Sequence, residues 1–364
     1  MHVKPPPAPQ GQDNEKTAAA GASAFARHGG NLAAARRLFP EAPEPWLDLS
    51  TGINPHAYPV ANLPLEAFAR LPDPSACRKL EVAAAAFYGA REPGLVVAAP
   101  GTQAIIQWLP RLFAAKNVGI RGLTYSEHAR AWGACGANVT IVEDIEQLIE
   151  KDVAVVVNPN NPDGRLLPVE DLRRLADELA ARGGLLVLDE AFVDLLGPSA
   201  SLVPCLPSAA IVVLRSFGKT FGLAGIRLGF AIAPPPLAEI IRAALGPWAI
   251  SGAAALLGSE AFSDPSWFAA MREKLTADGA ELDIVLRAAG AKIIGSTPLY
   301  RLVEHKDAFS WFFDLAGAGI LVRPFEARSN WLRFGIPAGD GECRRLRETL
   351  MDIVSARQRE HFSI

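Results

Sequence analysis

Between residues 95 and 232, short and mostly apolar runs alternate with stretches that have helical spacing of polar and apolar residues. The apolar runs lie at 95–99, 139–143, 153–157, 185–189, 211–215 and 228–232. A strand that is apolar on both faces is buried on both faces, as in a parallel sheet covered by helices. The alternation therefore predicts an α/β fold with a mostly parallel sheet. Ligands bind at the carboxyl ends of such strands, so the residues after each run are candidate site residues.

The pattern changes after about Pro234. A long helical stretch leads into short apolar runs, which alternate with helical segments up to the C-terminal region. This indicates a second, smaller α+β domain. We expect a flexible tail at 1–27, an N-terminal arm that contributes to the active site at 28–59, a large domain at 60–245 and a small C-terminal domain at 246–364.

Composition and charge exclude several classes of protein. The 36 basic and 39 acidic residues give a net charge of -3, and no basic stripe indicates a nucleic acid or a membrane surface as partner. The longest apolar stretch, 249–257, is far shorter than the roughly 18 residues that span a bilayer. The first 27 residues lack the apolar core of a secretory signal, and the 4 scattered cysteines are typical of a reduced, cytoplasmic protein. The 6 histidines form no ligand-like cluster, so no metal site is expected.

Three strand ends carry polar residues, and each of them has two possible interpretations. Gly101, Thr102 and Gln103 open a helix after the first run, which is either an ordinary turn or a seat for a phosphate. The sequence 158–164, NPNNPDG, is a rigid turn that is either structural or part of a site. Asp189 ends an apolar strand, where it either caps a helix or faces a bound cation, because a carboxylate is costly to bury alone.

The fourth strand end is the most specific of these features. Residues 216–227 read SFGKTFGLAGIR, which places Lys219 among glycines and aromatic residues at the end of a buried strand. Desolvation favours the neutral, nucleophilic form of an amine, so Lys219 is a candidate nucleophile towards carbonyl groups. A single lysine could equally be a solvated loop charge, but the complete string makes that reading much weaker.

The string SFGKTFGLAGIRLG resembles the lysine motif of the fold-type I pyridoxal-phosphate enzymes, the aminotransferase family. The order and spacing of NPNNPDG, LDEA and SFGK match the same family, and the resemblance extends from His28 onward. It implies a large domain with a mostly parallel seven-stranded sheet, a smaller α+β C-terminal domain and pyridoxal 5'-phosphate as cofactor. It also implies a homodimer with active sites near the subunit interface.

The resemblance assigns roles to individual residues of the cofactor site. Lys219 would form a Schiff base with the cofactor, and Asp189 would pair with the pyridine nitrogen, which makes the ring an electron sink. Asn161 would donate to the phenolate oxygen of the cofactor and lie near the substrate. Tyr125 falls where the family stacks an aromatic ring on the cofactor. The phosphate of the cofactor would be held by Ser216 and Arg227 and by the backbone N–H groups of Gly101, Thr102 and Gln103.

Two residues depart from the pattern of many relatives. Phe192 stands where a tyrosine often reaches the phenolate oxygen, so that hydrogen bond is absent here. Leu71 stands where a tyrosine often reaches the cofactor phosphate of the neighbouring subunit, which puts that contact in doubt. His128, close to Tyr125, is interpreted as structural, and a role in supporting a residue of the site is the alternative.

Further segments narrow the resemblance within the family. His28 begins HGGN, Ser50 lies in LDLSTGINP, and GPW stands at 246–248. These segments resemble the threonine-phosphate decarboxylases of cobalamin biosynthesis, which implies decarboxylation of L-threonine O-3-phosphate. Arg333 would then bind the substrate carboxylate, and His28, Ser50 and Arg323 the substrate phosphate. Histidinol-phosphate aminotransferase or a related amino-acid aminotransferase is the alternative enzyme, and a non-catalytic homologue is the alternative of another class.

Overall fold

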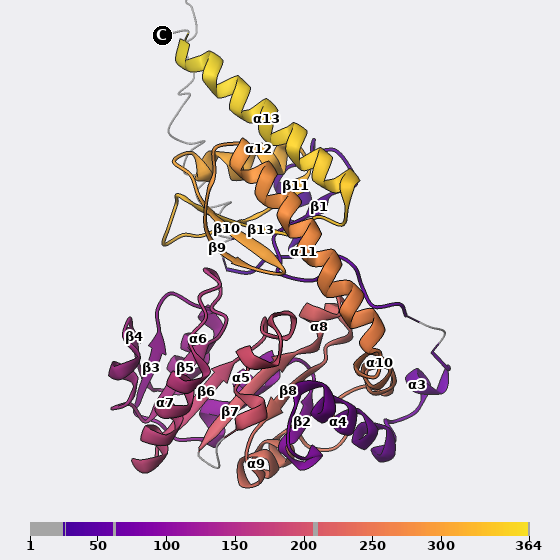
Figure 1. Ribbon diagram of the computed structural model, residues 1–364, viewed down its shortest axis with the longest axis vertical. Coiled ribbons are helices and arrows are strands. Elements are labelled where there is room, and N and C mark those ends of the chain that lie inside the picture. Colours follow the sequence, from indigo (N-terminus) through magenta and orange to yellow (C-terminus); the bar gives the residue numbers. More distant parts are fainter. Residues whose placement is uncertain (1–24, 26, 61–62, 207–209, 363–364) are drawn as a thin grey trace, which may run out of the picture. The chain divides into compact units, whose positions relative to one another are not determined.

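The computed structural model describes residue 25 and residues 27–60, 63–206 and 210–362 (Figure 1). The expected tail at 1–27 therefore lies almost wholly outside the described residues. The chain divides into two compact units. Unit 1 takes its residues from 1–51, 281–294 and 300–364, and unit 2 from 52–280 and 295–299.

Unit 2 is built on a sheet that has seven strands among the described residues, in the order β2-β8-β7-β6-β5-β3-β4 (Figure 1). Strand β8 runs antiparallel to both of its neighbours, and the remaining pairs are parallel. The predicted α/β fold with a mostly parallel seven-stranded sheet is thus confirmed. The strands are β2 (Val96–Ala99), β3 (Asn117–Arg121), β4 (Asn138–Val142), β5 (Val153–Val157), β6 (Leu185–Asp189), β7 (Ile211–Ser216) and β8 (Gly229–Ile232).

Helices cover both faces of this sheet. Alternate residues of each strand point to opposite sides, and both sides carry apolar side chains that pack against helices. In β5, Ala154 and Val156 join one apolar cluster, with side chains of α4, α7 and α10. Val153 and Val155 join a second cluster, with side chains of α5, α6 and α9. The helices of unit 2 are α3 (Glu66–Ala69), α4 (Pro74–Tyr88), α5 (Thr102–Leu112), α6 (Ser126–Ala134), α7 (Val169–Ala181), α8 (Phe217–Thr220), α9 (Pro235–Leu245) and α10 (Gly252–Phe262). Helix α11 (Pro265–Ala288) continues from unit 2 into unit 1.

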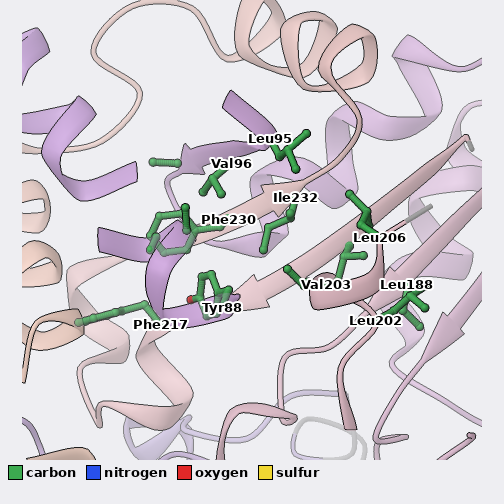
Figure 2. Packing of buried hydrophobic residues seen from close by; sticks show 14 of the residues in the cluster. Tyr88, Leu95, Val96, Leu188, Leu202, Val203, Leu206, Phe217, Phe230 and Ile232 are labelled. Carbon is green, nitrogen blue, oxygen red and sulfur yellow. The ribbon is translucent and has the colours of Figure 1, made fainter. Parts of the chain in front are cut away.

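The first cluster is the larger part of the core, and Figure 2 shows part of it around Phe230 and Tyr88. Aromatic rings from different elements meet there: the ring of Tyr88 lies 5.6 Å from that of Phe230 and 5.3 Å from that of Phe262. Phe217, at the start of α8, is fully buried in the same cluster. The core therefore extends directly to the helix that carries Lys219.

Unit 1 contains a four-stranded sheet in the order β12-β13-β10-β9, in which β13 is antiparallel to β10 and β12. A separate strand near the N-terminus, β1, pairs in parallel with β11, and Leu47 lies opposite Ile320. Trp311 and Phe312 of α12 are fully buried in this unit. Strand β9 (Lys292–Thr297) begins in unit 1, and its residues 295–297 belong to unit 2. The other elements of unit 1 are α2 (Leu32–Leu38), β1 (Leu47–Asp48), β10 (Tyr300–Glu304), α12 (Ala308–Gly317), β11 (Ile320–Leu321), β12 (Arg323–Pro324), β13 (Trp331–Gly335) and α13 (Asp340–Phe362).

This division differs from the expected domain boundaries at two places. Residues 52–59 belong to unit 2, although we expected them in the N-terminal arm. Residues 246–280 also belong to unit 2, although we expected the small domain to begin at 246. The reason is that α10 is apolar on most sides and buries Ala254, Leu257 and Phe262 in the large core cluster.

Candidate active site

The strand ends singled out in the sequence lie side by side at one edge of the sheet. Asp189, the last residue of β6, is paired in register with Val157 of β5 and with Leu214 of β7. Gly229, the first residue of β8, is paired with Ser216 on one side and with Ala99 on the other. The loops that begin with Asn158 and Pro100 and the helix that begins after Ser216 therefore start from neighbouring positions.

A cradle for an anion lies where β8 meets the start of α5. A Cβ atom on Gly229 would lie 2.6 Å from the backbone nitrogen of Thr102, so only glycine permits this approach. Gly101 has φ +82°, and a Cβ atom there would lie 2.6 Å from Nη2 of Arg227. No side chain caps the N-terminus of α5, whose N–H groups and dipole favour an anion. The structure thus brings Gly101, Thr102 and Arg227 together, as the sequence predicted for the cofactor phosphate.

Arg227 itself is held in an unusual backbone conformation, with φ 54° and ψ 56°. A non-glycine residue in this left-handed region costs on the order of 1–2 kcal/mol, and such strain is concentrated at functional sites. Its guanidinium Nη1 donates to the carbonyl of Ala224. The fold therefore supports a strained arginine next to the cradle.

Asp189 is buried, with 3% of its surface exposed, and both of its carboxylate oxygens are engaged. Oδ1 accepts from the backbone N–H of Ala191 at 3.1 Å, and Oδ2 lies 2.9 Å from Nε2 of His128. His128 is fully buried, and its Nδ1 has no hydrogen-bond partner among the described residues. The interpretation of His128 as merely structural missed this contact. The available signal was its position three residues after Tyr125, at the start of the same helix.

Tyr125 and Gln103 connect α6 with the cradle. The hydroxyl of Tyr125 donates to Oε1 of Gln103 at 3.1 Å, and Nε2 of Gln103 donates to Glu127 at 3.2 Å. The Tyr125 ring also makes an edge contact with the His128 ring, with centroids 6.2 Å apart. Tyr125 is therefore joined both to the cradle and to the partner of Asp189.

Lys219 lies on α8, and its Nζ is 5.4 Å from the centre of the Phe192 ring. Phe192 is buried, so the residue that departs from the family pattern packs beside the lysine. Asn161 is half-buried in the loop after β5. The neighbouring Asn160 fixes this loop by donating to the carbonyl of Leu123 at 3.0 Å. Leu71, the other departure, is exposed.

A buried ionic cluster joins Arg215 of β7 to Glu190 and Asp194, which follow β6, and sequence reasoning missed it. Nη1 of Arg215 contacts Glu190 at 3.0 Å, its Nη2 pairs with Asp194, and its guanidinium lies 4.3 Å from the Tyr88 ring. Burial alone would lower the pKa of Arg215, but the charges of Asp194 and Glu190 outweigh it and hold the pKa above its ordinary value. Burial also raises the pKa of Glu190 against the opposing charge of Arg215. The only sequence signals were Glu190 and Arg215 themselves, at the ends of apolar runs.

Unit 1 brings together residues expected to bind the substrate. Arg333 is buried, and its Nη2 donates to the carbonyl of Ser50 at 3.1 Å. The hydroxyl of Ser50 accepts from the backbone N–H of Gly30 at 2.7 Å, which fastens the HGGN segment beside it. Nη2 of Arg323 donates to the carbonyl of Arg27 at 2.9 Å. His28, in the same segment, is exposed.

Arg323 and Arg333 lie directly opposite each other on β12 and β13. Residues in such a pair share one face of the sheet, where like charges repel. Burial, and secondly the charge of Arg323, lower the pKa of Arg333 to about 9. The guanidinium is still charged at neutral pH, so an anion bound beside it would be stabilised.

Known proteins with related sequences and structures place the chain in a family. The family described as "Aminotransferase class I and II" matches residues 45–350, and the chain belongs to this family. The chain is 40% identical to threonine-phosphate decarboxylases from a Sinorhizobium species and from Pseudomonas aeruginosa, over 89% of its length and 97% of theirs. It is also similar in fold to a histidinol-phosphate aminotransferase from Sinorhizobium meliloti solved in complex with pyridoxal-5'-phosphate. The TM-score is 0.77 at 20% identity, over 89% of this chain and 94% of that chain.

The described residues hold neither a cluster of metal-ligating side chains nor a membrane-spanning helix. No group of three or more His, Cys, Asp or Glu side chains in the described part of the chain could hold a metal ion. None of the helices in this part combines the length and apolar character that a membrane span requires.

Proposed function

We propose that the chain is a pyridoxal-phosphate-dependent decarboxylase of L-threonine O-3-phosphate. It would release CO2 and (R)-1-aminopropan-2-yl phosphate as a step of cobalamin biosynthesis. The observation that carries the proposal is the similarity to two threonine-phosphate decarboxylases along nearly the whole of their length. The likeness to a histidinol-phosphate aminotransferase supports the fold alone, because the sequence identity there is low.

The residues of unit 2 fit pyridoxal 5'-phosphate at both of its charged ends. The phosphate would lie in the glycine cradle, against Arg227, Ser216 and the N–H groups of Thr102 and Gln103. Asp189 would face the protonated ring nitrogen, since a buried carboxylate gains from a cationic partner. Lys219 would hold the cofactor covalently, and Asn161 and Tyr125 would fix the orientation of its ring. When bound, the cofactor accepts the electron pair that a broken bond to the substrate Cα leaves behind.

Residues of unit 1 would orient the substrate. Its phosphate would be held by Arg323, Ser50 and His28, and its carboxylate by the planar fork of Arg333. Of the bonds to the substrate Cα, the one that breaks must be oriented so that its electron pair can pass to the cofactor. Anchoring the distal phosphate uses binding energy remote from the reacting atoms to select this bond.

The electron and proton balance of the step is simple. The Cα–carboxylate bond breaks, CO2 leaves, and the electron pair stays with the remaining fragment. The substrate amine would by then have taken the place of Lys219 on the cofactor, and the freed Lys219 amine would deliver a proton to Cα, so that one proton replaces the carboxylate. An aminotransferase would instead remove the Cα proton, and the carboxylate would stay on the substrate.

The proposal includes a homodimer and a cytoplasmic location. The resemblance to the family supports a dimer with active sites near the interface between its subunits. The free thiols of Cys77, Cys135 and Cys205 support a reducing compartment.

The test of the function is product analysis with L-threonine phosphate as the sole substrate and no keto acid. We expect CO2 and aminopropanol phosphate over many turnovers. Arrest after one turnover as the pyridoxamine form of the cofactor, with recovery on addition of 2-oxoglutarate, would identify an aminotransferase instead.

The cofactor site is tested by borohydride reduction of the holoenzyme, followed by peptide mass mapping. We expect the pyridoxyl group on Lys219. A label on another lysine would show that the SFGK motif has a different role in this chain.

A further inference from the structure

The helix that carries Lys219 has only four residues, so its C-terminal carbonyls need partners from outside the helix. The carbonyl of Lys219 accepts from the backbone N–H of Asn54 at 2.9 Å. The carbonyl of Thr220 accepts from Nδ2 of Asn54, also at 2.9 Å. The next carbonyl, of Phe221, accepts from the N–H of Tyr58 at 2.8 Å. Residues 54–58 thus supply the hydrogen-bond donors that a further turn of the helix would have supplied.

Asn54 is suited to this role because its side chain is buried and a hydrogen bond fixes the orientation of its amide group. Only 2% of its surface is exposed, and its Oδ1 accepts from the N–H of His56 at 2.9 Å. This bond leaves Nδ2 as the group that donates to Thr220. A Cβ atom on Gly222 would lie 2.7 Å from the carbonyl oxygen of Asn54, so the two backbones approach as closely as glycine permits.

Thr220 is held at a second atom as well. Its hydroxyl donates to Oδ2 of Asp194 at 2.7 Å, and Asp194 is itself paired with the buried Arg215. The residue next to Lys219 is therefore fixed through its side chain by the ionic cluster and through its carbonyl by Asn54. Of these two supports, only Asn54 also binds the backbone of Lys219.

We propose that Asn54 is a positioning residue for Lys219. The proposal rests on the proposed role of Lys219 as the cofactor lysine and proton donor to Cα. The amine must reach both the cofactor and Cα, and a misplacement of about 1 Å can cost about a hundredfold in rate. Asn54 acts through the backbone of α8 and does not need to touch the cofactor or the substrate.

The test compares Asn54→Asp with Asn54→Ala. Aspartate has the shape of asparagine, but its carboxylate cannot donate to the Thr220 carbonyl and would repel it. Its protonated form can donate, and burial favours this form. We expect kcat to fall roughly 10- to 100-fold at neutral pH in both variants, with a smaller change in KM. As the pH falls, kcat relative to wild type should recover in Asn54→Asp and not in Asn54→Ala.

Other titrating groups near this segment are shared with the wild type, so the ratio to wild type removes their effect. On the segment itself His56 pairs with Asp278 of α11 at 2.7 Å, and Asp278 also pairs with Lys274 at 3.4 Å. Asp194 accepts from the hydroxyl of Thr220, and Lys219 is the residue before Thr220 in the chain. A merely space-filling role for Asn54 predicts wild-type behaviour in Asn54→Asp at every pH.

A second readout does not depend on turnover. Acetic anhydride labels Lys219 in the cofactor-free, full-length chain, and peptide mapping gives the labelling rate. The rate should change severalfold in both Asn54 variants and recover at low pH in Asn54→Asp only. The matched control is Ser251→Ala, which removes the N-cap of α10 in the same unit at a cost of about 1 kcal/mol. This control should keep wild-type kcat and labelling.

The outcomes separate this proposal from the proposed function. Wild-type kcat and labelling in both Asn54 variants, or changes no larger than in Ser251→Ala, would overturn the positioning role. A pyridoxyl group on another lysine would overturn the role of Lys219 itself. Altered labelling with the pyridoxyl group on Lys219 and pH-dependent recovery in Asn54→Asp would support both.

Discussion

Substitution of Gly229 by alanine tests the anion cradle most directly. The added Cβ atom would lie 2.6 Å from the backbone nitrogen of Thr102 and 2.9 Å from the carbonyl carbon of Gly101. Real Cβ atoms do not approach backbone atoms this closely, and neither neighbour is a flexible side chain. The start of α5 must therefore move away from β8, and with it the N–H groups expected to hold the cofactor phosphate.

The size of the effect follows from the cost of overpacking, which is about 1–3 kcal/mol in a well-packed site. If this cost falls on the cradle, the affinity for pyridoxal phosphate drops roughly 5- to 150-fold. Equilibrium dialysis of the cofactor-free protein against pyridoxal phosphate measures this affinity, and thermal unfolding measures the cost to stability.

A matched control lies in the same segment of the chain. A Cβ atom on Gly225 would meet no atom within 4 Å, so Gly225→Ala should bind the cofactor like the wild type. Wild-type affinity in Gly229→Ala, whatever its Tm, would refute the assignment of the cradle to the phosphate.

Three further predictions concern charged groups. Asp189→Asn should keep its fold but lose about 100-fold or more in kcat, because a neutral amide no longer pairs with a cationic ring nitrogen; near wild-type turnover would contradict this. Inorganic phosphate should raise the Tm at neutral pH, and this effect should weaken as the pH rises through about 9, the pKa of Arg333. Arg333→Met should weaken the effect at neutral pH, and an unchanged response would remove Arg333 from the anion site. Arg215→Met should destabilise unit 2 by about 3–5 kcal/mol, because it leaves Glu190 and Asp194 buried without a cation. Its urea midpoint for cofactor-free unfolding checks this, and a wild-type midpoint would argue against the buried ionic cluster.

The sequence predicted the sheet and its binding edge because both depend on local patterns. Apolar runs such as 153–157 specify buried strands, and parallel strands place their carboxyl ends together. The cofactor and the residues expected to bind it were predicted through the resemblance of the motif around Lys219. Gly101, Thr102 and Arg227 do meet in the structure, although their roles stay a prediction.

The remaining features depend on contacts between distant residues, which no local pattern encodes. Nothing near Asn54 indicates that it binds the carbonyls of Lys219 and Thr220. The contact of His128 with Asp189 likewise joins the start of one helix to the end of a strand far along the chain. The two units divide the chain at other places than we expected for the same kind of reason, since the elements against which an apolar helix such as α10 packs are distant from it in the sequence.

The pairing of β1 with β11 has a consequence for how the chain acquires its structure during synthesis. Leu47 emerges from the ribosome long before Ile320, and all of unit 2 is made in between. Unit 2 can thus begin to fold while β1 still waits for its partner strand. The apolar residues around Leu47 are exposed throughout this interval, and an unpaired strand of this kind is prone to aggregation. A stall in translation before residue 320 should therefore leave a nascent chain with a folded unit 2 and an N-terminal segment available to chaperones.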